Sequence, residues 1–186
     1  MTDLTHLLEP TLYHNLPTDV LNLNFVVVGA GGTGGYLIPQ LVRQISLRNQ
    51  EHTRRTGLLH TITLYDADVV EEKNLQRQNF IIQDIGKNKA EVMAMRYGRS
   101  FQQEVRYVPE YVSDPNRFST QIYSGLNSNF DKALQAVILI DCTDNNKTRL
   151  LMRETADLLQ AKTNVVFLSS GNEEKAGQIV CSFKPS

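Results

Sequence analysis

The chain has 186 residues, a length that suits one domain with a sizeable hydrophobic core. Its 19 Lys and Arg residues nearly balance its 20 Asp and Glu residues, so charge gives no reason to expect nucleic acid or an anionic membrane as a partner. No apolar run approaches membrane-spanning length, and the acidic N-terminus does not resemble a signal peptide. Because the two cysteines form no CxxC pair, the expected setting is the cytoplasm, with reduced thiols.

Hydrophobic patterning divides the chain into two parts. Residues 1–23 form a weakly patterned N-terminal lead-in, in which a short helix is predicted to end near Pro17. Beyond it, buried strands alternate with amphipathic helices, and a polar loop at 48–57 is predicted as an insertion before the second strand. The predicted strands span 24–28, 59–66, 104–112, 136–144, 164–171 and 177–183, and the predicted helices span 33–49, 87–101 and 145–162.

This alternation predicts an α/β fold. Strands that are separated by helices imply a Rossmann-like, doubly wound, mostly parallel sheet with helices on both faces. The continuous apolar run AVILI at 136–140 is typical of a strand covered on both faces. Residues 24–186 are therefore predicted to form one domain of this class.

Five glycines in seven residues follow the first predicted strand, in the segment VVVGAGGTGG. Gly29, Gly31 and Gly34 match the pattern G-x-G-x-x-G, in which the first glycine allows a tight turn, the second close approach to a phosphate, and the third close packing of helix and strand. The following helix adds free N–H groups and the positive end of its dipole. The turn predicts a phosphate site that suits NAD or ATP, and the alternative is a tight turn that binds nothing.

Asp66 ends the second predicted strand, where an acid is expected to bind ribose hydroxyls. It lies 32 positions after Gly34, later than the roughly 20 residues of dinucleotide folds, and the polar insertion accounts for the delay. The alternative for Asp66 is a turn cap. Asp68 is interpreted as such a cap or as a support for Asp66.

The segment NLQRQNF contains Asn74, Arg77 and Gln78. On a helix these side chains would share one face. Arg can neutralise the β and γ phosphates of a nucleoside triphosphate, whose charge the glycine turn alone does not balance. The alternative is a solvated polar face.

Charged residues also stand at two helix starts. Lys87 and Lys89 open a predicted helix, where a cation is electrostatically misplaced unless an anion binds beside it; Lys87 is expected to face solvent. Asp144 follows a buried strand, at the edge where ligands bind in such sheets, and it could hold Mg²⁺ together with phosphates. Its alternative is the N-cap of helix 145–162, and Asp141 is interpreted as structural.

Four segments in this order resemble the motifs of ThiF/MoeB-type adenylyltransferases, the bacterial relatives of ubiquitin-activating enzymes: GAGGTGG, DADVVEEKNLQRQNF, DIGKNKA and DCTDNNKTR. The resemblance covers about residues 24–183. It implies an ATP-binding adenylation domain that uses ATP and Mg²⁺ to adenylate the C-terminal glycine of a small ubiquitin-like or sulfur-carrier protein ending in Gly-Gly. It also implies a homodimer, to which loop and helix surfaces around 118–130 could contribute.

The resemblance assigns a role to each motif residue. Gly29 belongs to the turn, Gly31, Gly32 and Gly34 approach the nucleotide, and Asp66 takes the ribose hydroxyls. Asn74, Arg77 and Gln78 are implied to bind the phosphates. Lys89 is implied to contact the α-phosphate region, and Asp144 to position Mg²⁺. The acceptor carboxylate attacks the α-phosphorus and pyrophosphate leaves, so positioning and charge neutralisation suffice without a protein nucleophile.

The sequence departs from the family pattern in three respects. Members usually carry an arginine before the first strand, which reaches the partner's site, but no arginine precedes Arg43 here. The paired CxxC motifs of a structural zinc site are absent, and the crossover segment with an acceptor cysteine is expected to be absent after Ser186. Cys142 and Cys181 are expected to be small buried hydrophobic residues rather than thioester nucleophiles.

Two alternative functions stay open at this point. The first is a non-catalytic module that binds a nucleotide or a partner, which the missing arginine and missing crossover segment favour. The second is an NAD-dependent oxidoreductase, which leaves Arg77, Lys89 and Asp144 unexplained and lacks a substrate domain. We expect ATP with Mg²⁺ to bind and NAD not to bind.

Overall fold

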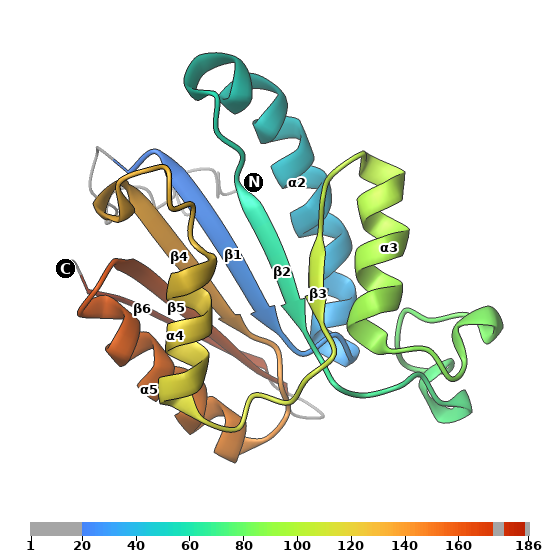
Figure 1. Cartoon of the computed structure of the whole chain (residues 1–186). Helices are drawn as coiled ribbons and strands as arrows, with labels where there is room; N and C mark the ends of the chain where they lie inside the picture. Colours follow the sequence, from blue (N-terminus) through green and yellow to red (C-terminus); the bar gives the residue numbers. More distant parts are fainter. Residues whose placement is uncertain (1–19, 173–176, 185–186) are drawn as a thin grey trace, which may run out of the picture.

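The computed structural model describes residues 20–172 and 177–184, which form one six-stranded sheet with helices packed against it (Figure 1). The strand order is β3-β2-β1-β4-β5-β6, and every neighbouring pair is parallel except the antiparallel pair β5–β6. The strands are β1 (Asn22–Val28), β2 (Thr61–Tyr65), β3 (Arg106–Val108), β4 (Gln135–Asp141), β5 (Asn164–Asn172) and β6 (Gly177–Lys184). The α-helices are α2 (Gly32–Thr56), α3 (Lys89–Phe101), α4 (Pro115–Gly125) and α5 (Asn146–Gln160).

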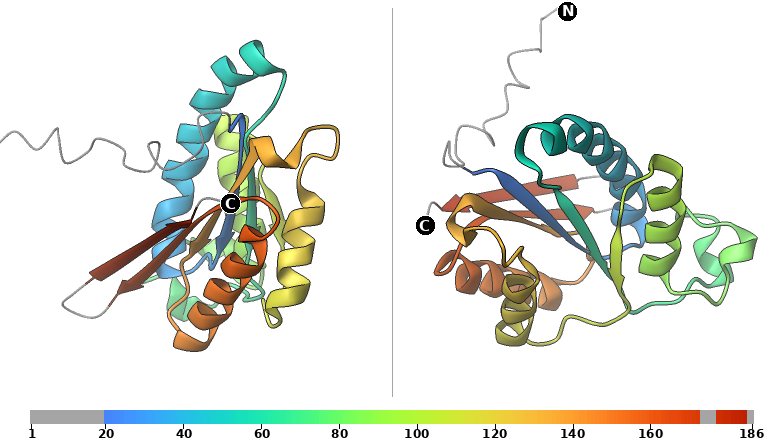
Figure 2. Two further views of the ribbon diagram at one scale, coloured as in Figure 1. Left: turned by 90° about the vertical axis from the view of Figure 1, so that its left-hand side faces the viewer. Right: turned by 45° about the horizontal axis from the view of Figure 1, so that its top comes forward.

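Helices cover both faces of the sheet, as the sequence predicted. Seen along the sheet, α2 lies on one side and α4 and α5 lie on the other (Figure 2, left). Alternate residues of β1 enter the two layers: Val27 packs in the cluster with Ile38 of α2, and Val26 packs in the cluster with Met152 of α5. The predicted α/β, Rossmann-like, mostly parallel fold is confirmed. The short helix predicted near Pro17 falls outside the described residues.

The polar loop predicted at 48–57 is wrong, because α2 continues to Thr56. The extra turns contain Arg, Gln and Glu, which favour helices without an apolar stripe. Asn49 is buried in this part of the helix. Its side chain donates a hydrogen bond to the backbone oxygen of His60 and accepts one from the N–H of His60. The helix ends at Gly57, which adopts the left-handed conformation with φ of 72°.

The third predicted strand is shorter than expected and is followed by a helix that was not predicted. β3 ends at Val108, because Pro109 cannot donate a hydrogen bond to a neighbouring strand. Helix α4 then starts after Asp114, whose side chain accepts a hydrogen bond from the N–H of Arg117 at 2.9 Å. Phe118 and Ile122 of this helix are buried in the core, so the apolar side chains proposed as a partner surface are used within the chain itself.

Candidate functional site

The carboxyl ends of β1, β2 and β4 meet at one edge of the sheet, where the strand order reverses direction between β1 and β4. Such a point is where open α/β sheets bind ligands. A cleft of about 500 Å³ lies there, between the glycine turn, the segment after β2, the loop after β3 and the segment after β4. A second pocket of about 440 Å³ adjoins it and shares seven residues with it: Ala67, Asp68, Arg77, Gln78, Lys89, Tyr111 and Asp144.

The glycines of the turn have different roles in the structure. Gly29 has φ of +98°, and a Cβ there would lie 3.0 Å from the backbone of Cys142. Gly31 and Gly32 line the cleft, and a Cβ on Gly32 would meet no atom within 4 Å. Gly34 lies behind the turn instead, because a Cβ there would be 1.9 Å from the carbonyl oxygen of Gly29. The turn thus leaves backbone open to a ligand at residues 31–32, whereas Gly34 serves packing.

The first turn of α2 points its backbone N–H groups toward this opening. The helix starts at Gly32, and its N-cap residue, Gly31, has no side chain that could cap it. The N–H groups at a helix start together with the helix dipole favour an anion. The glycine turn therefore has the local chemistry of a phosphate site.

Asp66 ties the end of β2 to the glycine turn. Its Oδ2 accepts a hydrogen bond from the N–H of Ala30 at 2.7 Å, and its Oδ1 accepts one from the N–H of Asp68 at 2.9 Å. Burial raises the pKa of Asp66, and the two backbone donors oppose that rise. Asp66 therefore caps the turn through its hydrogen bond from the N–H of Asp68, as the alternative interpretation expected. The same residue also lines the cleft.

The side chains of NLQRQNF lie on a 3₁₀ helix, Glu72–Asn74, and the turn that follows it, rather than on an α-helix. Asn74 is buried and lines only the second pocket, where its Oδ1 accepts a hydrogen bond from the N–H of Glu71 at 2.9 Å. Arg77 is exposed and lines both pockets. The Oε1 atom of Gln78, whose side chain lies beside Gly31, is buried without a hydrogen-bond partner among the described residues. A buried polar atom without a partner is a place where a ligand donor would be favourable.

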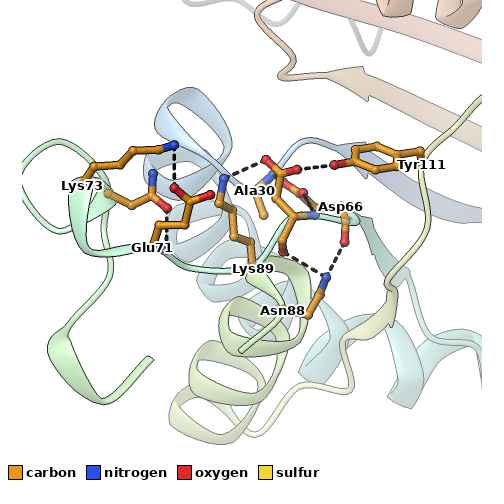
Figure 3. Close-up of polar contacts among 9 residues, drawn as sticks. Ala30, Asp66, Glu71, Lys73, Asn88, Lys89 and Tyr111 are labelled. Carbon is orange, nitrogen blue, oxygen red and sulfur yellow. Dashed lines mark hydrogen bonds and ion pairs between the residues drawn. The ribbon is translucent and has the colours of Figure 1, made fainter. Parts of the chain in front are cut away.

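Lys89 and Asp68 form an ion pair at the junction of the two pockets (Figure 3). The Nζ of Lys89 lies 2.9 Å from Oδ2 of Asp68, and the Lys89 side chain is only 8 % exposed. The hydroxyl of Tyr111 donates to the other oxygen, Oδ1, at 2.6 Å. Hydrogen bonds from Tyr111 and then Lys89 lower the pKa of Asp68.

The N-terminus of α3 is fastened to the segment after β2. Asn88 caps the helix by accepting a hydrogen bond from the N–H of Glu91 at 3.0 Å. Its Nδ2 donates to the backbone oxygens of Asp66 at 2.7 Å and Asp68 at 3.1 Å. Lys89 therefore enters the site from a fixed helix start, whereas Lys87 is exposed as expected.

Asp144 is exposed and lines both pockets. It is not the N-cap of α5. That position belongs to Asn145, whose Oδ1 accepts a hydrogen bond from the N–H of Thr148 at 2.8 Å. The Asp144 carboxylate is thus available to the cleft.

Asp141 is fully buried beneath this segment and holds it in place. Its Oδ1 accepts hydrogen bonds from both the N–H and the hydroxyl of Thr143, and its Oδ2 accepts one from the hydroxyl of Ser169. Arg149 places Nε 3.9 Å from Oδ2 of Asp141 and donates to the backbone oxygen of Ser170. These contacts support the structural interpretation of Asp141.

The two cysteines lie in different surroundings. Cys142 is buried, and burial together with the charge of Asp141 raises the pKa of its thiol to about 12, so it does not form a nucleophilic thiolate at neutral pH. Cys181 is exposed on β6, so its predicted burial is wrong. Within residues 20–172 and 177–184, no group of three or more His, Cys, Asp and Glu side chains could hold a metal ion by itself. No helix in the same ranges is long and apolar enough to cross a membrane.

Sequence reasoning missed two members of the site. From the sequence, Asp68 is interpreted as a cap or a support for Asp66, and Tyr111 is not identified as a site residue. Their partners are distant in sequence, since Asp68 is 21 residues from Lys89 and 43 residues from Tyr111. The DAD motif itself, with two acids at the end of one strand, was the signal that could have indicated a second charged role.

The fold and the cleft define a Rossmann-like protein with a glycine turn, two basic side chains and carboxylates at the strand ends. The chain belongs to the ThiF family, whose pattern matches residues 14–184. The adenylyltransferase and sulfurtransferase uba4 of Aspergillus niger is 33 % identical to it over 100 residues, which are 53 % of this chain and 18 % of that protein.

Solved structures of bacterial proteins share the fold. Escherichia coli MccB, crystallised with succinimide, superimposes with a TM-score of 0.59 at 19 % identity over 90 % of this chain and 42 % of MccB. The E. coli tRNA N6-threonylcarbamoyladenosine dehydratase TcdA, in complex with ATP, gives a TM-score of 0.53 at 25 % identity over 88 % of this chain and 56 % of TcdA. The chain therefore spans about half or less of the length of these relatives.

Proposed function

We propose that the protein binds ATP with Mg²⁺ and adenylates the C-terminal glycine of a small ubiquitin-like or sulfur-carrier protein. The observation that carries this proposal is the convergence of Arg77, Lys89 and Asp144 on the two pockets beside the glycine turn. Two cations and one carboxylate suit a metal-bound triphosphate better than the pyrophosphate bridge of NAD. Family membership supports the proposal, as do an adenylyltransferase relative and TcdA crystallised with ATP.

Different residues of the cleft would bind different parts of ATP. The N–H groups at the start of α2 and the Nε2 amide group of Gln78 would donate hydrogen bonds to phosphate oxygens, and Asp66 would bind the ribose hydroxyls. Arg77 would neutralise the outer phosphates, and Lys89 would stabilise the charge that grows on the α-phosphate. The acceptor carboxylate needs no activating base, because it is ionised at neutral pH.

The donor set also fits Mg²⁺. This ion is commonly held by one or two carboxylates together with substrate phosphates, and the exposed carboxylate of Asp144 faces the pockets without serving as a helix cap. Bound there, Mg²⁺ would neutralise phosphate charge. A site made by protein ligands alone is not expected, since the described residues contain no metal-binding cluster.

The nucleotide preference is tested by titration calorimetry with ATP and Mg²⁺ and, separately, with NAD. We expect binding of ATP at micromolar strength and no heat from NAD, because only the triphosphate uses Arg77, Lys89 and Asp144 together. Binding of NAD without a response to ATP would refute the proposal and support an oxidoreductase.

Adenylation itself is tested by ATP–pyrophosphate exchange in the presence of candidate carrier proteins that end in Gly-Gly. Lys89→Ala should lower exchange by about 10²–10³-fold and weaken ATP binding much less, since its main effect is on transition-state charge. Tyr107→Phe, outside both pockets, is the control. ATP binding without exchange for any carrier would favour a non-catalytic nucleotide-binding module.

A further inference from the structure

The ammonium of Lys89 is held in an unusual position for a cation. It belongs to the first residue of α3, where the helix dipole disfavours positive charge, and its side chain is 8 % exposed. A buried ammonium is strongly unfavourable without a partner. Asp68 is that partner, with its Oδ2 atom 2.9 Å from Nζ of Lys89, so the position of the ammonium depends on the position of the Asp68 carboxylate.

Asp68 does not use all the donors of Lys89. An ammonium has three N–H groups, and the hydrogen bond to Oδ2 of Asp68 occupies one of them. Lys89 lines both pockets, so the other two donors remain available to a ligand there. The ion pair thus orients the ammonium without blocking it.

Asp68 is in turn held from the opposite side. Its side chain is 46 % exposed, and its Oδ1 receives the hydroxyl of Tyr111 at 2.6 Å. Tyr111 belongs to the loop between β3 and α4, which forms a different wall of the cleft from that of α3. Figure 3 labels Lys89 and Tyr111, which lie on opposite sides of one carboxylate; the hydrogen bonds that they donate to Oδ2 and Oδ1 identify that carboxylate as Asp68.

We propose that Asp68 and Tyr111 are positioning residues for adenylation, which hold the Lys89 ammonium at the junction of the two pockets. This inference rests on the proposed function for its consequence in catalysis. The contact of Lys89 with Asp68 and of Asp68 with Tyr111, called the tether below, is a property of the protein without nucleotide. Loss of either residue leaves the ammonium less fixed, so it lowers the adenylation rate through Lys89 while the glycine turn and Arg77 continue to bind ATP.

The test measures the reactivity of Lys89 directly. The nucleotide-free protein is treated at fixed pH with a limiting amount of an N-hydroxysuccinimide ester, and labelling of each lysine is followed by mass spectrometry. Asp68→Asn should increase labelling of Lys89 about tenfold, the factor that corresponds to loss of one charge-assisted hydrogen bond. Tyr111→Phe, which removes one hydroxyl from an exposed side chain, should increase it roughly threefold, because the neutral hydroxyl contributes less.

Controls are available in the same molecule. Lys87, exposed two residues earlier, should label equally in all variants. Tyr107→Phe changes a tyrosine on β3 that lines neither pocket, and it should leave Lys89 unchanged. Thermal unfolding confirms that each variant is folded.

The outcomes separate the tether from the proposed function. Faster labelling of Lys89 in both variants, with ATP affinity within about twofold of the wild type for Tyr111→Phe, supports the inference. Unchanged labelling of Lys89 overturns it, whatever the nucleotide does. If Lys89 is labelled faster in both variants but neither the wild type nor the variants bind ATP, the tether is retained and the function proposed above is overturned.

Discussion

At the start of α5, two adjacent residues with similar side chains have different roles. Asp144 and Asn145 are both exposed at the cleft, but only Asn145 caps the helix. We expect Asp144→Asn to weaken Mg²⁺-dependent ATP binding by about tenfold or more and to leave the melting temperature unchanged, because an amide is a poor Mg²⁺ ligand beside phosphates but removes no cap.

The neighbouring change is the matched control. Asn145→Ala should lower the free energy of unfolding by about 1 kcal/mol through loss of the bond to the N–H of Thr148, and it should weaken Mg²⁺-dependent ATP binding less than Asp144→Asn does, since Asn145 lines the cleft but its loss removes no carboxylate. Calorimetry with Mg²⁺ or with EDTA, combined with thermal unfolding, checks both variants. Full Mg²⁺-dependent binding by Asp144→Asn would show that the metal assignment is wrong.

Single residues differ in how well the sequence indicated their surroundings. Arg77, Lys89 and Asp144 stand in motifs at element boundaries, and the structure brings all three to the same pair of pockets. The bond between Tyr111 and Asp68 could not be predicted, because it depends on the path of the loop after β3. The buried, unpartnered Oε1 of Gln78 is likewise a consequence of packing rather than of sequence spacing.

At the scale of elements, the outer part of α2 packs against the start of β2 through two histidines. The rings of His52 and His60 stack with centroids 4.0 Å apart, and Nδ1 of His60 accepts a hydrogen bond from the N–H of Leu23 at 3.2 Å. Burial first, and then the charges of His52 and Arg48, lower the pKa of His60 from 6.5 to about 4. The folded chain therefore keeps this imidazole neutral where the unfolded chain protonates it.

This contact predicts a loss of stability in mild acid. Between pH 6.5 and 4 the unfolded state binds a proton at His60 that the folded state does not, so the free energy of unfolding falls as pH decreases. We expect a decrease on the order of 2 kcal/mol from pH 7 to pH 5 through this residue. Urea unfolding at several pH values measures the slope, which His60→Asn should reduce because the amide does not titrate. An unchanged slope in the variant would contradict the assignment.

Elements were predictable where their apolar period was strong. The buried run of β4 and the helix α3 were both predicted from the sequence. The end of α2 was mistaken for a loop because its polar residues carry no period, although Asn49 is anchored to His60. Helix α4 was missed even though Asp114 and Pro115 form a typical helix start, because the only two apolar residues in its buried layer, Phe118 and Ile122, lie among polar ones.

At the scale of the whole molecule, three isoleucines form an exposed apolar surface outside the hydrophobic core. Ile81, Ile82 and Ile85 are exposed within five residues of each other, on the 3₁₀ segment that precedes α3. We propose that a second copy of the chain covers them, consistent with the homodimer that the family motifs imply. Exposed apolar side chains that gather in one place often mark an interface.

Analytical ultracentrifugation tests this association. The wild-type protein should sediment as a dimer at high micromolar concentration, and Ile82→Glu should shift it toward monomer, because the new charge would be buried without a partner. Leu150→Glu is the control, since Leu150 is 70 % exposed on α5, against 68 % for Ile82. A wild-type protein that is strictly monomeric would argue against the dimer, and equal behaviour of the two variants would place the interface elsewhere.

The strand order has a consequence for synthesis on the ribosome. β1 is complete at residue 28, but the partner on one of its sides, β4, begins at residue 135. The nascent chain therefore carries an unpaired apolar edge, including Val26 and Val27, for more than a hundred residues of elongation. At about 5–20 residues per second, that interval is roughly 5–20 seconds, long enough for a chaperone to bind before the cleft can assemble.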